Sequence, residues 1–196
     1  MQTDAAFERA MRGLLHPRRV AIVGASERMG FASSIQRVMM RAGYDGEILP
    51  VNPRYESVFG YQAYPTVDAI PGEVDLAFLV VPNRFVFDVL EQCERAQVKA
   101  VNIISSGFAE KQEDATGGER QSMLRAWAER TGIRIVGPNC LGIISVPNRF
   151  NALSGPFDFP LHPGPVSAIF QSGLLIYSLV MPMHERGMGF TYVVTS

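Results

Sequence analysis

Short, nearly continuous apolar runs alternate along this chain with longer stretches in which apolar residues recur at helical spacing. The runs that predict strands lie at 20–24, 46–53, 74–82, 99–105 and 133–146, the last with a fifth strand, a turn and a short sixth strand. The stretches that predict helices lie at 33–43, 84–97 and 118–132. Unbroken apolar runs are typical of strands buried on both faces, and strands that alternate with helices predict β-α-β units. We therefore expect an α/β fold with a doubly wound parallel, Rossmann-like domain over roughly residues 15–147.

Elements outside this pattern are expected at both ends of the chain. Apolar residues at helical spacing predict a short N-terminal helix over 4–15. Residues 148–165 are rich in proline and lack periodicity, which predicts a linker or covering loop. Strands are then expected at 166–170 and 190–196. The helix between them should be kinked or shortened by Pro182.

A second unit of two strands and one helix cannot bury its own faces. The chain is therefore either a fragment of a longer protein, which we favour, or depends on packing against the first domain. The expected organisation is a first domain over 1–147, a linker over 148–165, and the truncated first β-α-β unit of a second domain over 166–196. An unfinished sheet also predicts an exposed apolar edge, and hence a homo- or hetero-oligomeric partner.

Composition excludes several classes of function. A net charge of −1 and the lack of a basic block argue against nucleic-acid binding, because such affinity comes largely from clustered Lys and Arg. The longest apolar stretch, 173–183, is too short to span a bilayer, and the N-terminus lacks the apolar run of a secretory signal. Cys93 and Cys140 are too few for a zinc cluster, so no metal site is expected. We expect a soluble, cytoplasmic protein.

The first strand-to-helix turn, "GASERMG", is the strongest local signal of a ligand site. A dinucleotide-binding turn has a middle glycine, whereas here Ser26 stands in the middle and the spacing is longer. The following helix would offer its N–H groups and its positive end to a phosphate. A plain structural turn is the alternative. The residues expected to contact a cofactor phosphate are Gly24, Ala25, Ser26, Glu27, Arg28, Met29 and Gly30.

The end of the second strand bears on which nucleotide binds. NAD-binding domains carry an acidic residue there for the ribose 2′-hydroxyl, but this chain has "VNPRY". A cation at that edge favours a ligand with an extra phosphate, which is either NADP or coenzyme A with its 3′-phosphate. The candidate residues are Asn52, Pro53, Arg54 and Tyr55.

Two further strand ends lie on the same carboxyl edge, where ligands of open α/β sheets bind. The serines there could offer hydroxyl or N–H groups to a phosphate or a pantetheine amide, although each alone is more typical of a turn. The candidates at these ends are Val81, Pro82, Ser105, Ser106 and Gly107, and Asn139 in the tight turn after the fifth strand is a further candidate. Cys140 has no histidine nearby in sequence to act as a base, so it is interpreted as a packing residue and no catalytic residue is assigned.

The turn "QSG" marks a second point at which a strand becomes a helix. Gln171, Ser172 and Gly173 could cradle a phosphate or carboxylate, with Tyr177 one turn into the helix. Simple capping of the helix by Ser172 is the alternative interpretation. No histidine of the chain has the spacing of a metal site or a catalytic triad.

The order of these motifs resembles the N-terminal part of the NDP-forming acyl-CoA synthetases, the ADP-forming acetate–CoA ligase group, which is related to the alpha subunit of succinyl-CoA ligase. The matching segments are "PRRVAIVGAS", "GEILPVNPRY", "VDLAFLVVP", "ISSGFAE", "RIVGPNCLGIIS", "PGPVSAIFQSG" and "GMGFTYVVTS". Each is weak alone, but their order and spacing are specific. The resemblance implies a CoA-binding Rossmann-like domain followed by the start of a flavodoxin-like ligase domain.

The resemblance also implies roles for individual residues. It places 26–29 on the loop that holds CoA phosphates, Arg54 and Tyr55 at a CoA-contacting basic position, and 105–107 on a further CoA-binding segment. It matches Tyr177 to a substrate-binding tyrosine, and "QSG" to the helix turn that meets the phosphate or phosphohistidine. The family usually has Ser where this chain has Phe170, which puts one phosphate contact in doubt.

Members of that family convert a carboxylic acid, ATP and CoA into acyl-CoA, ADP and phosphate. The phosphohistidine segment and the ATP-grasp segment of the family have no counterpart in these 196 residues. The resemblance therefore implies that this chain binds CoA without completing catalysis, with ATP and Mg²⁺ used only by the complete enzyme. Two alternatives stay open: a stand-alone CoA-binding regulatory module, and an NAD(P)-dependent oxidoreductase domain.

Overall fold

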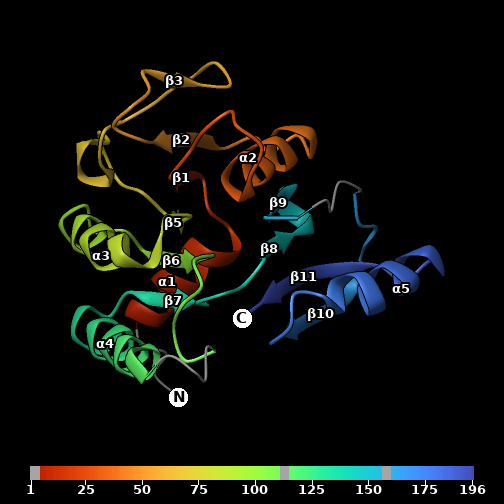
Figure 1. The fold of residues 1–196 in the computed structure, drawn as a ribbon. Coiled ribbons are helices and arrows are strands. Elements are labelled where there is room, and N and C mark those ends of the chain that lie inside the picture. Colours follow the sequence, from red (N-terminus) through yellow and green to blue (C-terminus); the bar gives the residue numbers. More distant parts are fainter. Residues whose placement is uncertain (1–4, 111–114, 156–159) are drawn as a thin grey trace.

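The computed structural model describes residues 5–110, 115–155 and 160–196 (Figure 1). A parallel five-stranded sheet lies at its centre, in the order β2-β1-β5-β6-β7. Its strands are β1 (Arg19–Val23), β2 (Glu47–Val51), β5 (Leu76–Leu79), β6 (Ala100–Ile103) and β7 (Arg134–Val136). Every residue of β5 and β6 is buried, as their unbroken apolar sequences predict.

Helices cover both faces of this sheet, so the doubly wound α/β fold is confirmed. Alternate strand residues enter opposite cores, because side chains along a strand point to opposite faces. Ala21 and Ala77 share one core with α3 (Val86–Arg95) and α4 (Ala115–Thr131). Ile22 and Phe78 share the other with α1 (Ala5–Leu15) and α2 (Phe31–Arg41). The order of strands reverses direction between β1 and β5, and ligands of such sheets bind at the carboxyl ends of the strands beside that point.

The second sheet corrects the expected organisation of the C-terminal region. Its strands are β8 (Gly142–Ser145), β9 (Phe150–Leu153), β10 (Pro163–Phe170) and β11 (Phe190–Thr195), in the order β10-β11-β8-β9. Only β10 and β11 are parallel, since β8 pairs antiparallel with both β11 and β9. The expected sixth strand therefore exists, but it belongs to this sheet and not to the parallel one. The sheet has four strands, not the two expected.

The expected loop over 148–165 is wrong where it contains β9 and the first residues of β10. A short 3-10 helix, η3 (Val146–Asn148), and Arg149 at a φ of 50° turn the chain back so that β9 can pair with β8. Phe150 is fully buried, with its ring centroid 5.3 Å from that of Tyr44. Burial of this aromatic ring against α2 explains why a short, proline-flanked segment forms a strand. The domain boundary at 147 stays a prediction.

The segment after β10 contains a π-helix, Ile176–Val180, followed by α5 (Met181–Glu185). Pro182 lacks an N–H, and its ring would collide with a carbonyl of an α-helical preceding turn. The widened turn before it, in which the N–H of Met181 donates to the carbonyl of Ile176, gives the chain room for this ring. The distortion predicted at Pro182 is confirmed.

Strand β10 is an edge strand of the second sheet, and the side chain of Ile169 on this strand is 77% exposed.

A short hairpin between β2 and β5 was not predicted from the sequence. Its strands are β3 (Ser57–Val58) and β4 (Tyr61–Gln62), joined by Phe59 and Gly60, both of which have positive φ. Two further 3-10 helices, η1 (Val67–Ala69) and η2 (Asn83–Phe85), flank β5. Across the described ranges, no helix combines the length and apolar character needed to cross a membrane.

The amino-terminal edge of the parallel sheet carries a hydrogen-bonded ion cluster around Asp75. One carboxylate oxygen of Asp75 accepts from the backbone N–H groups of Arg18 and Arg19 at 2.7 and 2.9 Å. The other accepts from Lys99 Nζ at 2.6 Å. Burial alone would raise the pKa of Asp75, but these hydrogen bonds and the Lys99 charge outweigh it and lower that pKa. The cluster ties the starts of β1, β5 and β6 together.

Candidate functional site

The turn after β1 passes so close to β5 that only glycine fits at its first position. Gly24 has a φ of +89°, and a Cβ there would collide with the carbonyl oxygen of Val80. Its N–H donates to Val51 at 2.9 Å. Gly24 therefore holds the turn against the carboxyl ends of both neighbouring strands, which brings residues 25–30 over the edge of the sheet.

The N-terminus of α2 opens directly from this turn. Gly30 precedes the first helical residue, and its N–H donates to the hydroxyl of Ser33 at 3.1 Å. The first N–H groups of a helix have no carbonyl partner within that helix. Because α2 starts at Phe31, these groups and the positive end of the helix lie at the carboxyl edge, as predicted. A phosphate could accept from them.

Asn52 fixes the turn after β2 to the turn after β1. Its side-chain nitrogen donates to the carbonyl of Ala25 at 2.8 Å, and its oxygen accepts from the N–H of Arg54 at 3.0 Å. Arg54 and Tyr55 are exposed beyond this clamp. Within the described residues, the Arg54 guanidinium has no hydrogen-bond or ion-pair partner, so it is available to a phosphate.

A pocket lies at the carboxyl ends of β5 and β6, and we name it the edge pocket. It has a volume of about 290 Å³ and is lined by Phe31, Val80, Val81, Pro82, Asn83, Ile104, Ser105, Ser106 and Asn139. Five of these nine residues were predicted from three separate strand ends. The sheet therefore brings Val81, Pro82, Ser105, Ser106 and Asn139 together, as expected for parallel strands that end at one edge.

The polar groups of the edge pocket differ in whether a ligand could use them. The Ser105 hydroxyl donates to the carbonyl of Val81 at 2.5 Å. The predicted Gly107 does not line the pocket: its N–H is bonded to the Glu110 carboxylate, and its carbonyl accepts from Arg120. Ser105 and Gly107 therefore shape the surroundings of the pocket more than they offer donors to it. Ser106 is exposed, and its hydroxyl has no partner in the described part of the chain.

A second hollow, which we name the helix pocket, follows the exposed side of α2. It has a volume of about 260 Å³ and is lined by Met29, Gly30, Ser33, Ser34, Arg37, Val38, Arg41 and Gly155. Met29 is 97% exposed and Phe31 is 58% exposed, so two large apolar side chains stand in solvent where the two pockets meet the start of α2. Large exposed apolar groups at such a point are typical of a ligand or partner site.

Some of the predicted turn residues hold the turn in place. A carboxylate oxygen of Glu27 accepts from the N–H of Phe59 at 2.7 Å and so ties the turn to the β3–β4 hairpin. The Ser26 hydroxyl accepts from the N–H of Arg28 at 3.1 Å. Arg28 itself is exposed, and Ala25 is buried. Glu27 and Ser26 thus stabilise the conformation of the turn whether or not a ligand is present.

The predicted "QSG" site lies apart from the edge pocket but next to one of its walls. Gln171 and Ser172 are exposed, and a Cβ at Gly173 would collide with the side chain of Leu141. Leu141 follows Asn139 by two residues, so the end of β10 adjoins the turn that closes the edge pocket. Tyr177 is half-buried, which raises the pKa of its phenol, and its hydroxyl lies close to Gly155 of the helix pocket.

Neither cysteine is placed to act as a nucleophile. Cys140 is buried, and its thiol lies 3.2 Å from Asn102 Oδ1. Burial raises the pKa of both the Cys93 and the Cys140 thiol to about 12, which keeps them protonated at neutral pH. The interpretation of Cys140 as a packing residue is confirmed. The described residues contain no cluster of three or more His, Cys, Asp or Glu that could hold a metal ion.

Several residues of these pockets were not predicted from the sequence, among them Phe31, Asn83 and Arg37. Phe31 and Asn83 each lie one position beyond a predicted residue, and Arg37 lies on the solvent face of α2. The sequence gives no signal for Phe31, because it stands four residues before Ile35 and eight before Met39, so helical spacing alone would place it on the buried face of α2, whereas it is exposed.

Comparison with known proteins identifies the family. The sequence model described as CoA binding domain matches residues 18–145. The chain is 40% identical over 176 residues to the ADP-forming acetate–CoA ligase I subunit alpha of Pyrococcus furiosus, a match that covers 87% of this chain and 37% of that protein. It is 35% identical over 185 residues to the ADP-forming acetate–CoA ligase I of Archaeoglobus fulgidus, which covers 94% of this chain and 26% of that protein.

A solved structure agrees with these matches. The dinucleotide-forming acetyl-coenzyme A synthetase 1 of Ca. Korarchaeum cryptofilum, in complex with phosphate and ADP, superposes with a TM-score of 0.86 at 33% identity. The match covers 95% of this chain and 39% of that one. The chain thus spans well under half the length of these relatives. The family model matches residues 18–145, which are more than half of the chain and include all five strands of the parallel sheet. The chain therefore belongs to the CoA binding domain family.

Proposed function

We propose that this chain holds coenzyme A at the carboxyl edge of its parallel sheet, as the CoA-binding part of an ADP-forming acid–CoA ligase. One observation carries the proposal: the edge pocket opens beside the N-terminus of α2 and unites residues from three strand ends. The family match makes CoA the expected occupant of this edge. NADP is disfavoured, because neither a middle glycine nor an acidic residue after β2 is present.

Each part of CoA has a matching feature at this edge. The diphosphate would accept from the N–H groups of Phe31 and Ala32 in the first turn of α2, because the Gly30 N–H is already bonded to the Ser33 hydroxyl. The 3′-phosphate would pair with the exposed Arg54 guanidinium, which suits phosphate because it offers several donors in one plane. The pantetheine amides would lie in the edge pocket, where the Ser106 hydroxyl is unpartnered and the apolar walls cover the methylene groups.

The role of this chain in the ligase reaction is to bind and orient CoA. Its thiols are buried and protonated, so nucleophilic chemistry would come from other parts of the enzyme. The remaining ligase segments or a partner subunit would bind ATP with Mg²⁺ and activate the carboxylic acid. The "QSG" turn, and Tyr177 beside Gly155 of the helix pocket, would face those segments. A cytoplasmic location and a homo- or hetero-oligomeric assembly remain predictions.

Calorimetric titration of the purified protein with CoA, dephospho-CoA and NADP tests this proposal. We expect CoA to bind about tenfold more tightly than dephospho-CoA, because a charge-assisted pair with Arg54 is lost with the 3′-phosphate. Arg54→Ala should erase that difference and leave dephospho-CoA binding unchanged. Arg125→Ala, an exposed change on α4 on the other face of the sheet, is the matched control and should alter neither.

The same titration separates the rival interpretations. NADP binding without a response to CoA would reject the proposal in favour of an oxidoreductase domain. CoA binding by a protein whose natural reading frame stops near Ser196 would support a stand-alone regulatory module instead of a ligase part. CoA binding that Arg54→Ala leaves unchanged would keep CoA as the ligand but reject the assignment of the 3′-phosphate.

A further inference from the structure

Two side-chain hydrogen bonds tie the loop that carries Arg54 to the turn after β1. At the start of this loop, the side-chain nitrogen of Asn52 donates to the carbonyl of Ala25 at 2.8 Å. At its end, the N–H of Phe59 donates to a carboxylate oxygen of Glu27 at 2.7 Å. Arg54 therefore lies on a loop that is fixed at both ends to one turn, and α2 begins directly after that turn.

The end of this loop is also anchored to α2 itself. Val58 is fully buried and belongs to the same core as Ile35. Its carbonyl accepts at 3.2 Å from the side-chain nitrogen of Gln36, which is fully buried as well. The Arg37 guanidinium lies 5.0 Å from the centre of the Phe59 ring, in a cation–π contact. The β3–β4 hairpin is thus held against the helix whose first N–H groups would bind the diphosphate.

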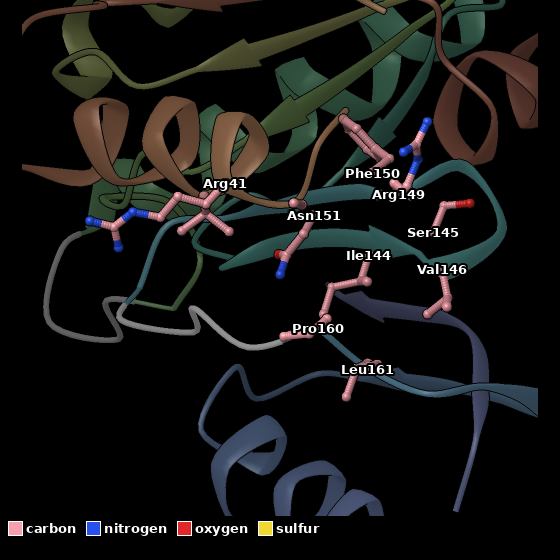
Figure 2. A pocket seen from close by; sticks show the side chains of 11 residues that line it. Arg41, Ile144, Ser145, Val146, Arg149, Phe150, Asn151, Pro160 and Leu161 are labelled. Atoms are coloured by element: carbon pink, nitrogen blue, oxygen red, sulfur yellow. The ribbon is translucent and has the colours of Figure 1, made fainter. Parts of the chain in front are cut away.

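The β8–β9 hairpin fixes α2 independently of this loop. The Ser34 hydroxyl donates to the carbonyl of Gly155 at 2.9 Å, and Phe150 is fully buried in the core beneath α2. Figure 2 shows this hairpin beside α2, with a hollow of about 170 Å³ between them. None of the described residues that line this hollow belongs to 24–30 or 52–59. A change at the Arg54 loop should therefore leave α2 in place.

The charge and the hydrogen bond of Glu27 act in opposite directions on a bound phosphate. By charge alone, a carboxylate on this turn would repel a diphosphate. Through its bond to Phe59, however, Glu27 fixes where Arg54 lies relative to the start of α2. That placement matters because the diphosphate and the 3′-phosphate of CoA are attached to the same ribose, so their separation varies little.

We propose that Glu27 is a positioning residue that favours the 3′-phosphate of CoA, although it carries a charge of the same sign. The inference rests on the proposed function, because it takes Arg54 as the partner of the 3′-phosphate. A loop held at both ends presents Arg54 with little further loss of conformational entropy on binding. Without the bond from Glu27, the ligand itself would have to order the loop, and the affinity gained from the 3′-phosphate would fall.

The ratio of CoA affinity to dephospho-CoA affinity, measured by calorimetry within each variant, tests this inference. Glu27→Ala should lower the ratio from about tenfold to about twofold, because the bond to Phe59 is lost. Glu27→Gln should keep the ratio at about tenfold, because its amide oxygen can still accept from the Phe59 N–H without the charge. A smaller folded fraction weakens both ligands equally and leaves the ratio unchanged. In an Arg54→Ala background, Glu27→Ala should not change the ratio further.

Glu56→Ala is the matched control, because it removes an exposed carboxylate from the same loop and none of these hydrogen bonds. It should not lower the ratio. Hydrogen exchange at the Phe59 amide reports the bond without any ligand and should be faster in Glu27→Ala than in Glu27→Gln. Equal ratios in the two Glu27 variants, whether high or low, would overturn the inference while CoA binding stands. Failure of the unchanged protein to bind CoA would reject the proposed function and this inference with it.

Discussion

The two edges of the parallel sheet are opposites in how their polar groups are used. At the amino-terminal edge, Asp75 accepts three hydrogen bonds and Lys99 pairs with both Asp75 and Glu73. At the carboxyl edge, the Ser106 hydroxyl, the Arg54 guanidinium and the N–H groups of Phe31 and Ala32 have no partner in the described residues. The first edge satisfies these polar groups internally, whereas the second leaves several of its own without a partner.

This difference separates stability from binding along the same five strands. Substitutions at the amino-terminal edge should lower the free energy of unfolding and leave CoA affinity unchanged. Substitutions of the unpartnered groups at the carboxyl edge should lower the CoA affinity and leave the free energy of unfolding unchanged. Changes that affect both quantities are expected only where a carboxyl-edge residue also holds the backbone, as Gly24 does.

The largest expected effect is that of Asp75→Ala. Removal of this side chain leaves two backbone N–H groups without their acceptor and Lys99 with only Glu73 as a partner, which should lower the free energy of unfolding by about 3 kcal/mol. Urea denaturation measures this change. Asp45→Ala is the matched control, because the Arg18–Asp45 pair is exposed and should contribute less than about 0.5 kcal/mol. Equal effects of the two substitutions would contradict the assigned role of the cluster.

The same cluster predicts how stability depends on pH. Because the pKa of Asp75 is lower in the folded than in the unfolded chain, its contribution is complete above about pH 4, the unfolded value, and is lost as pH falls through the folded pKa. The loss should be smaller than that caused by Asp75→Ala, since a protonated carboxyl still accepts one bond. Urea denaturation between pH 2 and pH 6 should show Asp75→Asn responding less to acid than the unchanged protein. Parallel curves would refute this.

Gly24 and Gly30 provide a comparison within one turn. Gly24→Ala should cost about 2 kcal/mol of stability and abolish CoA binding, because a Cβ at a φ of +89° would collide with the Val80 carbonyl. Gly30 has extended backbone at a φ of 168° and open space around it, so Gly30→Ala should change stability by less than about 0.5 kcal/mol. Thermal denaturation and CoA titration of both variants measure the contrast. A stable, CoA-binding Gly24→Ala protein would show that the turn can shift.

The smallest expected effects are those of two adjacent serines. Ser105→Ala should lower the free energy of unfolding by about 1 kcal/mol, because its hydroxyl bonds Val81. Ser106→Ala should leave stability unchanged and weaken CoA about fivefold, since its hydroxyl is free for a pantetheine amide. Paired denaturation and titration measurements check both. A stability loss at Ser106, or unchanged CoA affinity there, would mean that the two serines do not divide these roles.

Much of the fold and of the candidate site was predictable, because both follow from local patterns. Unbroken apolar runs gave the strands of the parallel sheet, and glycine at 24 and 43 marked the turn after β1 and the end of α2. Parallel strands end at one edge, so residues that follow separate strands, such as Pro82, Ser106 and Asn139, could be grouped without knowledge of their contacts.

The remainder depended on contacts between distant segments. β9 is a four-residue strand flanked by prolines, and its burial comes from α2 and Tyr44, which no local pattern reveals. The engagement of the Gly107 N–H by Glu110 and the unpartnered oxygen of Asn151 are equally invisible, because each depends on where a side chain finds its partner. Sequence could name the donors and acceptors at the site, but not which of them the protein itself satisfies.

The β8–β9 hairpin follows the parallel domain in sequence yet supplies half of the second sheet. Phe150 belongs to the core beneath α2, while Ile144 on the adjacent strand belongs to the core beneath β11. A chain cut after residue 147 would lose β9 and leave β8 unpaired, exposing apolar surface in both halves. The parallel sheet and the second sheet should therefore unfold in one calorimetric transition rather than two. Neither sheet can be exchanged as a module without the β8–β9 hairpin that packs against both.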